Sequence, residues 1–268
     1  MSNVRPIFLI AGNTITGILR GVVLNVLMAL ALVMILAAMS PSAGGDSPMQ
    51  IRKTLVDSAL AGITVLGAMI AILTGFTMIP GEIESRTIYP VLSKPVRRWQ
   101  FLIGKFVGAV GINAIVVGLL SLIFFVYYYY MQHSFDGRLP IACFMIFSML
   151  VILSAIIIFL STFMSWIGTI IVSMIIWLTA SYSQFFYDLA ANDHAAKNEI
   201  SKAAFQIVQK ILPNFQSMDM RDIIVNNMTS ASARSIEPMQ WLLPLGINCI
   251  YGIIALALAI LIFNYREV

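Results

Sequence analysis

The chain has 268 residues, of which 60% are hydrophobic and only 10% are charged, and its formal net charge is +4. Soluble globular domains are about 25% charged, so this composition excludes an ordinary water-soluble protein. In a membrane protein a basic excess reflects side chains that face the anionic cytoplasmic leaflet, and we therefore expect no nucleic-acid partner.

Five windows of the chain contain no Asp, Glu, Lys or Arg: 21–45, 58–81, 106–135, 139–187 and 238–265. One bilayer span takes about 20 apolar residues. As a single helix the fourth window would be about 70 Å long, more than twice a hydrocarbon core of about 30 Å, so we expect it to turn back within 161–169. The sequence thus predicts an all-α integral membrane protein, a single transmembrane domain over residues 1–268 with six transmembrane helices. The expected spans are 21–40, 58–80, 102–130, 140–162, 167–187 and 241–264.

Residues 1–19 precede the first expected span and mix apolar side chains with Asn3, Arg5 and Asn13. This pattern predicts a short helix that lies in the membrane interface. The apolar run that follows is long enough to cross the bilayer, so we read it as a membrane helix and not as a cleavable signal peptide.

The loop between the second and third expected spans carries the densest basic cluster of the chain: Arg86, Lys94, Arg97, Arg98 and Lys105. Basic residues concentrate in cytoplasmic loops, so this loop is predicted to face the cytoplasm. With six spans, both termini of this multi-pass protein of the cytoplasmic (inner) membrane are then cytoplasmic as well. The loop over 188–240 falls on the outer side; it carries five basic residues, but it also carries six acids, and long loops follow the charge rule weakly.

Residues 82–96, which lie in the cytoplasmic loop, have the least ordinary pattern of the chain. Pro80 and Gly81 interrupt the second span, and Glu82 and Glu84 place acids in the first turn of a helix, where its dipole favours them. We expect a short amphipathic helix that offers the cytosol both charge and an apolar surface. The alternative is an ordinary basic loop that binds lipid headgroups.

The outer loop 188–240 contains apolar residues at helical spacing from about residue 194 to residue 212, and Pro213 ends the pattern. This spacing predicts an amphipathic helix. Its apolar face covers either the ends of the spans or a lipid surface, and packing against the spans is the simpler interpretation.

Motifs for nucleotide binding and ion coupling are missing from the sequence. Gly104-Lys105 is followed by Phe106 and lacks the upstream glycine of a P-loop. An ion-coupled transporter or a proton relay would carry charged side chains within its spans, and the five windows have none. We therefore expect no enzyme activity and no cofactor in this chain.

Metal binding has little support in the sequence. His133 is isolated, and no second ligand lies at a suitable spacing. Loose chelation by Asp188, Asp193 and His194 is one interpretation of those residues, and the polarity of a solvated loop explains them equally well.

Several polar side chains fall in or near the expected spans, and we expect most of them to form hydrogen bonds between helices. They are Asn25, Thr64, Thr74, Thr77, Asn113, Ser154, Gln184 and Asn248. Gly104, Gly108 and Gly111 share one face at the start of the third span and predict the close approach of another helix.

The segment around 82–105 resembles the cytoplasmic coupling region of ABC transporter permeases of the type-two exporter group. The motifs of that group are an acidic start, an Arg-Thr pair, Leu-Ser-x-Pro and a final Gly-Lys. They stand here as Glu82 and Glu84, Arg86-Thr87, Leu92-Ser93-Lys94-Pro95 and Gly104-Lys105. The resemblance extends to IAGNTITGILR near the N-terminus, LPNFQSMDMRD before the last span and the final FNYREV. Within the group the chain is most similar to the branch that includes the permease associated with nitrous oxide reductase maturation.

This resemblance implies that the chain is the permease subunit of an ABC transporter and moves a substrate, by export, across the cytoplasmic membrane. Two permeases, identical copies or paralogues, would stand side by side in membrane lipid. Each would rest its coupling helix on one subunit of a cytosolic ABC ATPase dimer, which binds ATP and Mg²⁺. Polar contacts would come from Glu82, Glu84, Arg86 and Thr87, apolar contacts from Ile88 and Leu92, and Ser93, Lys94 and Pro95 would complete the coupling motif.

An alternative function uses the same assembly without transport. The six-span dimer and its ATPase would then transmit force to an extracytoplasmic protein through the loop 188–240. The sequence has no ring of pore-lining charges that would support a passive channel, and it has no catalytic set that would support a lipid-embedded enzyme.

Overall fold

The computed structural model describes residues 5–21, 25–26, 28–29, 33, 47–78, 98–133, 136–183, 212–221, 223–224 and 238–265. These residues form helices and no strands, which confirms the all-α class. The helices are α1 (Arg5–Leu19), α3 (Pro48–Met78), α6 (Arg98–Gln132), α7 (Leu139–Ser161), α8 (Trp166–Ser181) and α12 (Pro238–Tyr265), with a 3₁₀ turn, η2, at Gln216–Met218.

Four of the described helices are long and apolar enough to cross a membrane: α3 over Met49–Gly75, α6, α7 and α12. They confirm a multi-pass membrane protein. The helix α8 has 16 residues, or about 24 Å, and is shorter than the expected span 167–187, whose last residues lie outside the described part of the chain. Most of the expected first span, 21–40, also lies outside it. Six spans therefore stay a prediction.

The helices α3 and α6 extend beyond the spans that the sequence predicted. The start of α3 at Pro48 precedes residue 58, and the hydroxyl of Ser47 accepts a hydrogen bond from the Gln50 backbone N–H at 3.3 Å, as a helix cap does. Charge marks the edge of the apolar window, but it does not end a helix. The 31 residues of α3 and the 35 of α6 correspond to about 46 and 52 Å, so both helices are longer than a hydrocarbon core.

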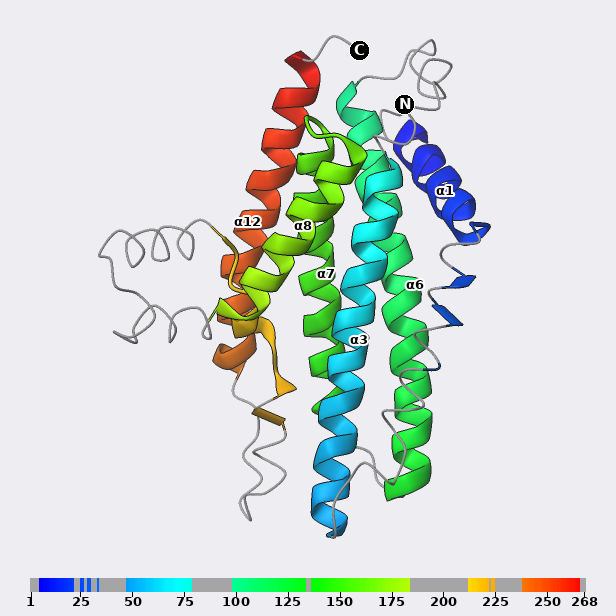
Figure 1. Ribbon diagram of the computed structural model, residues 1–268, viewed down its shortest axis with the longest axis vertical. Helices are drawn as coiled ribbons and strands as arrows, with labels where there is room; N and C mark the ends of the chain where they lie inside the picture. Colours follow the sequence, from blue (N-terminus) through cyan, green and yellow to red (C-terminus); the bar gives the residue numbers. More distant parts are fainter. Residues whose placement is uncertain are drawn as a thin grey trace, which may run out of the picture.

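The helix α7 lies at the centre of the bundle. Of its most apolar window 78% is buried, against 22% for α12, and α7 packs against α3, α6, α8 and α12. The contact with α3 is close: a Cβ atom on Gly67 would lie 2.7 Å from Leu150, and one on Gly75 would lie 2.5 Å from Ile157. Figure 1 shows α3, α6, α7 and α12 as long, roughly parallel columns, with α1 alongside one end of α6.

The two ends of the bundle differ in which helices begin and finish there. At the Arg98 end, α3 and α7 finish, α6 begins and α12 finishes, and this is the end that the sequence predicts to be cytoplasmic. At the Arg52 end, α3 begins and α6 finishes. Figure 1 shows the described start of α1 and the described end of α12 at the same end of the molecule, the Arg98 end.

Hydrogen bonds between helices form at some of the predicted polar residues. Asn113 of α6 donates to the Ser154 hydroxyl of α7 at 2.8 Å and to the Leu150 carbonyl oxygen at 3.3 Å. Thr64 and Thr74 instead donate to carbonyl oxygens of their own helix, four residues back. Threonine hydroxyls reach such a carbonyl easily, whereas the longer amide of Asn113 reaches the next helix.

Candidate functional site

The predicted coupling residues lie between the end of α3 at Met78 and the start of α6 at Arg98, outside the described residues. They are Glu82, Glu84, Arg86, Thr87, Ile88, Leu92, Ser93, Lys94 and Pro95. The structure does describe the helix ends on both sides of this segment. These helix ends are the elements to which the predicted coupling segment is directly attached.

Arg98, the first residue of α6, is bonded to the end of α12. Its guanidinium donates to the carbonyl oxygens of Phe263 and Asn264, each at 3.3 Å. The last carbonyl groups of a helix have no partner within the helix, and a positive charge there is favoured by the helix dipole. The first turn of α6 is thus joined to the last turn of α12.

A buried lysine and two phenylalanines extend this contact. The rings of Phe101 and Phe263 stack with their centroids 6.1 Å apart, and the Lys105 ammonium lies 5.5 Å from the Phe101 ring centroid. Only 5% of Lys105 is exposed, so its charge is held inside the packed end of the expected span 102–130. Lys105 lies seven residues, or about 10 Å, along α6 from Arg98.

The glycine face of α6 receives α1. A Cβ atom on Gly104 would lie 2.9 Å from Ile10 Cβ, and one on Gly108 would lie 2.9 Å from Thr14 Cβ. On Gly111 it would lie 2.7 Å from Ile15 Cδ1. These distances confirm the predicted close approach at the three glycines and identify α1 as the partner helix. Together α1, the start of α6 and the end of α12 form one packed unit, which we call the Arg98 platform.

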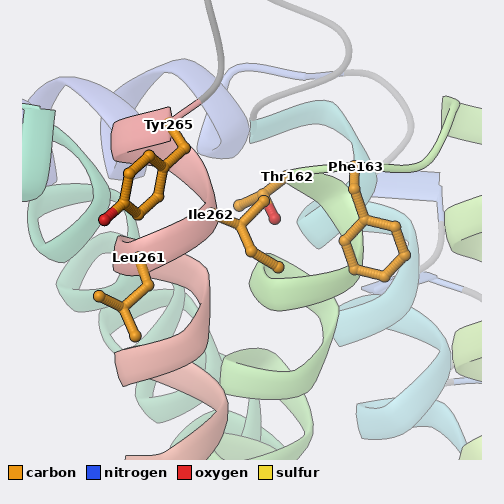
Figure 2. A pocket seen from close by; sticks show the side chains of 5 residues that line it. All are labelled: Thr162, Phe163, Leu261, Ile262 and Tyr265. Carbon is orange, nitrogen blue, oxygen red and sulfur yellow. The ribbon is translucent and has the colours of Figure 1, made fainter.

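An open hollow of about 440 Å³ lies beside this platform, between the end of α7 and the last turns of α12. Thr162, Phe163, Leu261, Ile262 and Tyr265 line it. Figure 2 shows Ile262 directed toward Thr162, whereas Leu261 and Tyr265 project from the other side of α12. The Thr162 hydroxyl donates to the Phe159 carbonyl oxygen at 2.7 Å, and the other four lining side chains are aliphatic or aromatic.

The opposite end of the bundle is held by an arginine that the sequence analysis did not select. Arg52 of α3 donates to the hydroxyl of Tyr128 of α6 from Nε at 2.9 Å and from a terminal nitrogen at 2.6 Å. It also lies 3.8 Å from the Asp136 carboxylate. Because Tyr128 is completely buried, these bonds fix the start of α3 to the end of α6.

Residues 212–221, 223 and 224, which we call the pre-α12 segment, are docked on the bundle. Phe215, Met218, Met220 and Ile224 are each at most 2% exposed. Asn248 of α12 donates to the Asn214 carbonyl oxygen at 3.1 Å. The predicted amphipathic helix at 194–212 lies outside the described residues, apart from residue 212.

Charge pairs connect the pre-α12 segment to α3. The Arg221 guanidinium bonds the Asp219 carboxylate through Nε at 2.7 Å and lies 4.0 Å from the Asp57 carboxylate. Sequence reasoning missed Arg52, Asp57 and Arg221. Arg52 and Asp57 lie just before the expected span 58–80, but Arg221 lies 20 residues before the expected span 241–264, and no spacing in the sequence indicates that Arg221 pairs with Asp57.

Within the described residues, no three or more His, Cys, Asp or Glu side chains gather where they could hold a metal ion. Cys143 is buried, Cys249 is exposed, and both are free thiols. The polar chemistry of the described chain thus lies mainly at its two ends, with the Asn113–Ser154 bond between them.

Residues 16–268 match a protein-family model described as "ABC-2 family transporter protein". No curated protein matches the chain. The family match runs from within α1 to the C-terminus and includes the predicted coupling segment, α6, α12 and the pre-α12 segment.

Proposed function

The chain belongs to the ABC-2 transporter family, and we propose that it is a six-span permease whose residues 82–96 rest on a separate cytosolic ATPase. Family membership makes it a membrane permease of an ABC transporter, a transmembrane component that is not itself catalytic. We propose that ATP and Mg²⁺ bind to the partner subunits and that this chain uses the work of their hydrolysis.

The observation that carries the proposal is the bond from Arg98 to the end of α12. The predicted coupling segment leads directly into Arg98. A push on that segment would move the start of α6, and the Arg98 platform would move with it, since α1 fills the glycine face of α6 and α12 is bonded to Arg98. Three helices would therefore respond to one contact with the ATPase.

Within the coupling segment, the proposed contacts divide by chemistry. Glu82, Glu84, Arg86 and Thr87 supply charged and hydrogen-bonding groups to a groove of the ATPase. Ile88 and Leu92 supply apolar contact, and the Ser93-Lys94-Pro95 motif ends the helix before α6 begins. The family resemblance supports these assignments.

We further propose that two permeases, identical or paralogous, form the complete membrane unit and export a substrate across the cytoplasmic (inner) membrane. Both termini would be cytoplasmic, as the basic loop predicts. The similarity to the branch that includes the nitrous oxide reductase maturation permease stays a prediction, because the family match does not distinguish branches.

A second function, force transmission to an extracytoplasmic protein, is favoured by one observation. The pre-α12 segment is not loosely attached: Asn248 holds Asn214, and Arg221 lies against Asp57. A partner that binds the loop 188–240 would thus be mechanically connected to α3 and α12. Transport predicts a continuous lined path between two permeases, whereas force transmission predicts a tightly packed dimer.

The coupling contacts can be tested with the double variant Glu84→Ala/Arg86→Ala in the full-length tagged chain. We expect normal membrane insertion, less ATPase in the purified complex and weaker stimulation of ATP hydrolysis. Glu199→Ala/Lys202→Ala, which also removes one acid and one base but in the predicted outer loop, is the matched control. Unchanged co-purification and unchanged stimulated hydrolysis in the first variant would contradict the assignment.

A further inference from the structure

A small cavity lies between α3, α7, α8 and the pre-α12 segment. Its volume is about 80 Å³. A cavity that holds one water molecule has a volume of about 10–15 Å³, so this cavity has room for a molecule of a few heavy atoms. Its walls come from helices and from the docked segment, and they combine polar and apolar side chains. Thr64, Met149, Trp177, Ser181 and Phe215 are among them.

Two hydrogen-bonding groups of this wall have no hydrogen-bond partner among the residues that the structure describes. Trp177 is 5% exposed, and its indole Nε1–H forms no hydrogen bond within the described chain. The buried Ser181 hydroxyl, one helical turn along α8, forms none either. An indole N–H can only donate, and a buried donor without an acceptor is unfavourable. A ligand with an acceptor oxygen would satisfy both of these donors.

The charges at the cavity argue for a neutral ligand. Arg221 and Asp219 both line it, and Arg221 is already bonded to Asp219 and lies beside Asp57. One cation and two carboxylates leave an excess of negative charge, which disfavours an anion. Met149 and Phe215 provide apolar contact on other walls.

We propose that this cavity is a binding site for a small neutral molecule that carries a carbonyl or ether oxygen. The oxygen accepts hydrogen bonds from Trp177 and Ser181, and the apolar part of the ligand lies against Met149 and Phe215. The site lies within one permease chain and needs neither a second copy nor the ATPase. It is thus separate from the proposed coupling function.

The test uses acrylamide as the probe, a small neutral amide that quenches indole fluorescence on contact. Trp177 is made the single tryptophan by Trp99→Phe, Trp166→Phe and Trp241→Phe, and the full chain is placed in lipid nanodiscs. We expect quenching that saturates with acrylamide concentration, as occupation of one site requires. Ser181→Ala should raise the half-saturating concentration about fivefold, since it removes one hydrogen bond.

A pair of matched variants tests whether the cavity is responsible. Ala61→Leu adds a larger side chain to the cavity wall and should abolish saturable quenching. Ala257→Leu adds the same side chain to the exposed face of α12 and should leave quenching unchanged. If the triple tryptophan variant does not fold, Trp177→Phe in the native chain provides the test, because it should remove the saturable part of the total quenching.

Three results would overturn the proposal: no quenching of Trp177, quenching that rises linearly without saturation, or saturable quenching that Ala61→Leu leaves intact. The first result would mean that acrylamide cannot enter the cavity. The second would mean that acrylamide reaches Trp177 by diffusion without binding. The third would mean that acrylamide binds at another site. None of them bears on whether an ATPase binds residues 82–96, so failure here and failure of the proposed function are distinguishable.

Discussion

The guanidinium of Arg98 donates to the backbone carbonyl oxygen of Asn264 at 3.3 Å, which joins residues 166 positions apart in the chain. The bond fastens the first residue of α6 to the last turn of α12. Together with the contact of α1 against Gly104 and Gly108, it makes the Arg98 end a single packed unit. The proposed coupling segment, residues 82–96, is followed in the chain by Arg98, the first residue of this unit.

Replacing Arg98 by Ala should uncouple that unit without preventing insertion into the membrane. A cation at a helix C-terminus contributes about 0.3–1 kcal/mol, so thermal stability in detergent should fall only slightly. Stimulated ATP hydrolysis should fall more than stability does. Arg98→Lys should restore part of the stimulated hydrolysis, and Lys53→Ala near the start of α3, at the Arg52 end of the bundle, is the control. Full hydrolysis in the Arg98→Ala variant would show that the bond carries no coupling.

Gly108→Ala should push α1 away from α6, because a Cβ atom there would lie 2.9 Å from Thr14 Cβ. Overpacking costs about 1–3 kcal/mol, while alanine regains up to about 1 kcal/mol of helix propensity. We therefore expect a net loss of about 1–2 kcal/mol, measured by thermal unfolding in detergent. At Gly118 an added Cβ would meet nothing within 4 Å, so Gly118→Ala is the matched control and should be neutral or stabilising. Equal behaviour of the two variants would mean that α1 does not pack on α6.

The hydrogen bond from Asn113 to Ser154 should contribute measurably to the contact of α6 with α7. Hydrogen bonds between membrane helices average about 0.6 kcal/mol and reach about 1.7 kcal/mol. A double-mutant cycle with Asn113→Ala and Ser154→Ala should give a coupling energy in that range. Strictly additive effects of the two substitutions would show that the pair does not interact.

Tyr128→Phe should destabilise the Arg52 end, since it removes the oxygen that accepts two N–H groups of Arg52. A hydrogen bond to a charged group contributes about 1.5–3 kcal/mol when buried, and Arg52 is partly exposed, so we expect about 1 kcal/mol. Tyr130→Phe is the control, because Tyr130 is 73% exposed. Equal unfolding temperatures of the two variants would show that the Arg52–Tyr128 hydrogen bonds do not stabilise this end.

The sequence predicts the described spans well where an apolar window and a helix coincide, as in α6, α7 and α12. It does not predict the start of α3, because Arg52 and Asp57 are compatible with a helix that continues out of the lipid. The three glycines of α6 predict that some helix approaches, yet only the fold identifies α1. Pairing of Arg52 with Tyr128, 76 residues away, leaves no local pattern, since it arises when α3 and α6 meet.

Affinity purification of the tagged full-length chain in mild detergent, followed by mass spectrometry, tests the central claim most directly. We predict that a soluble ATPase with a P-loop co-purifies in a fixed ratio to the chain. Glu84→Ala/Arg86→Ala should lower that ratio. Reproducible absence of any such ATPase, with the chain intact and folded, would contradict the proposed permease function.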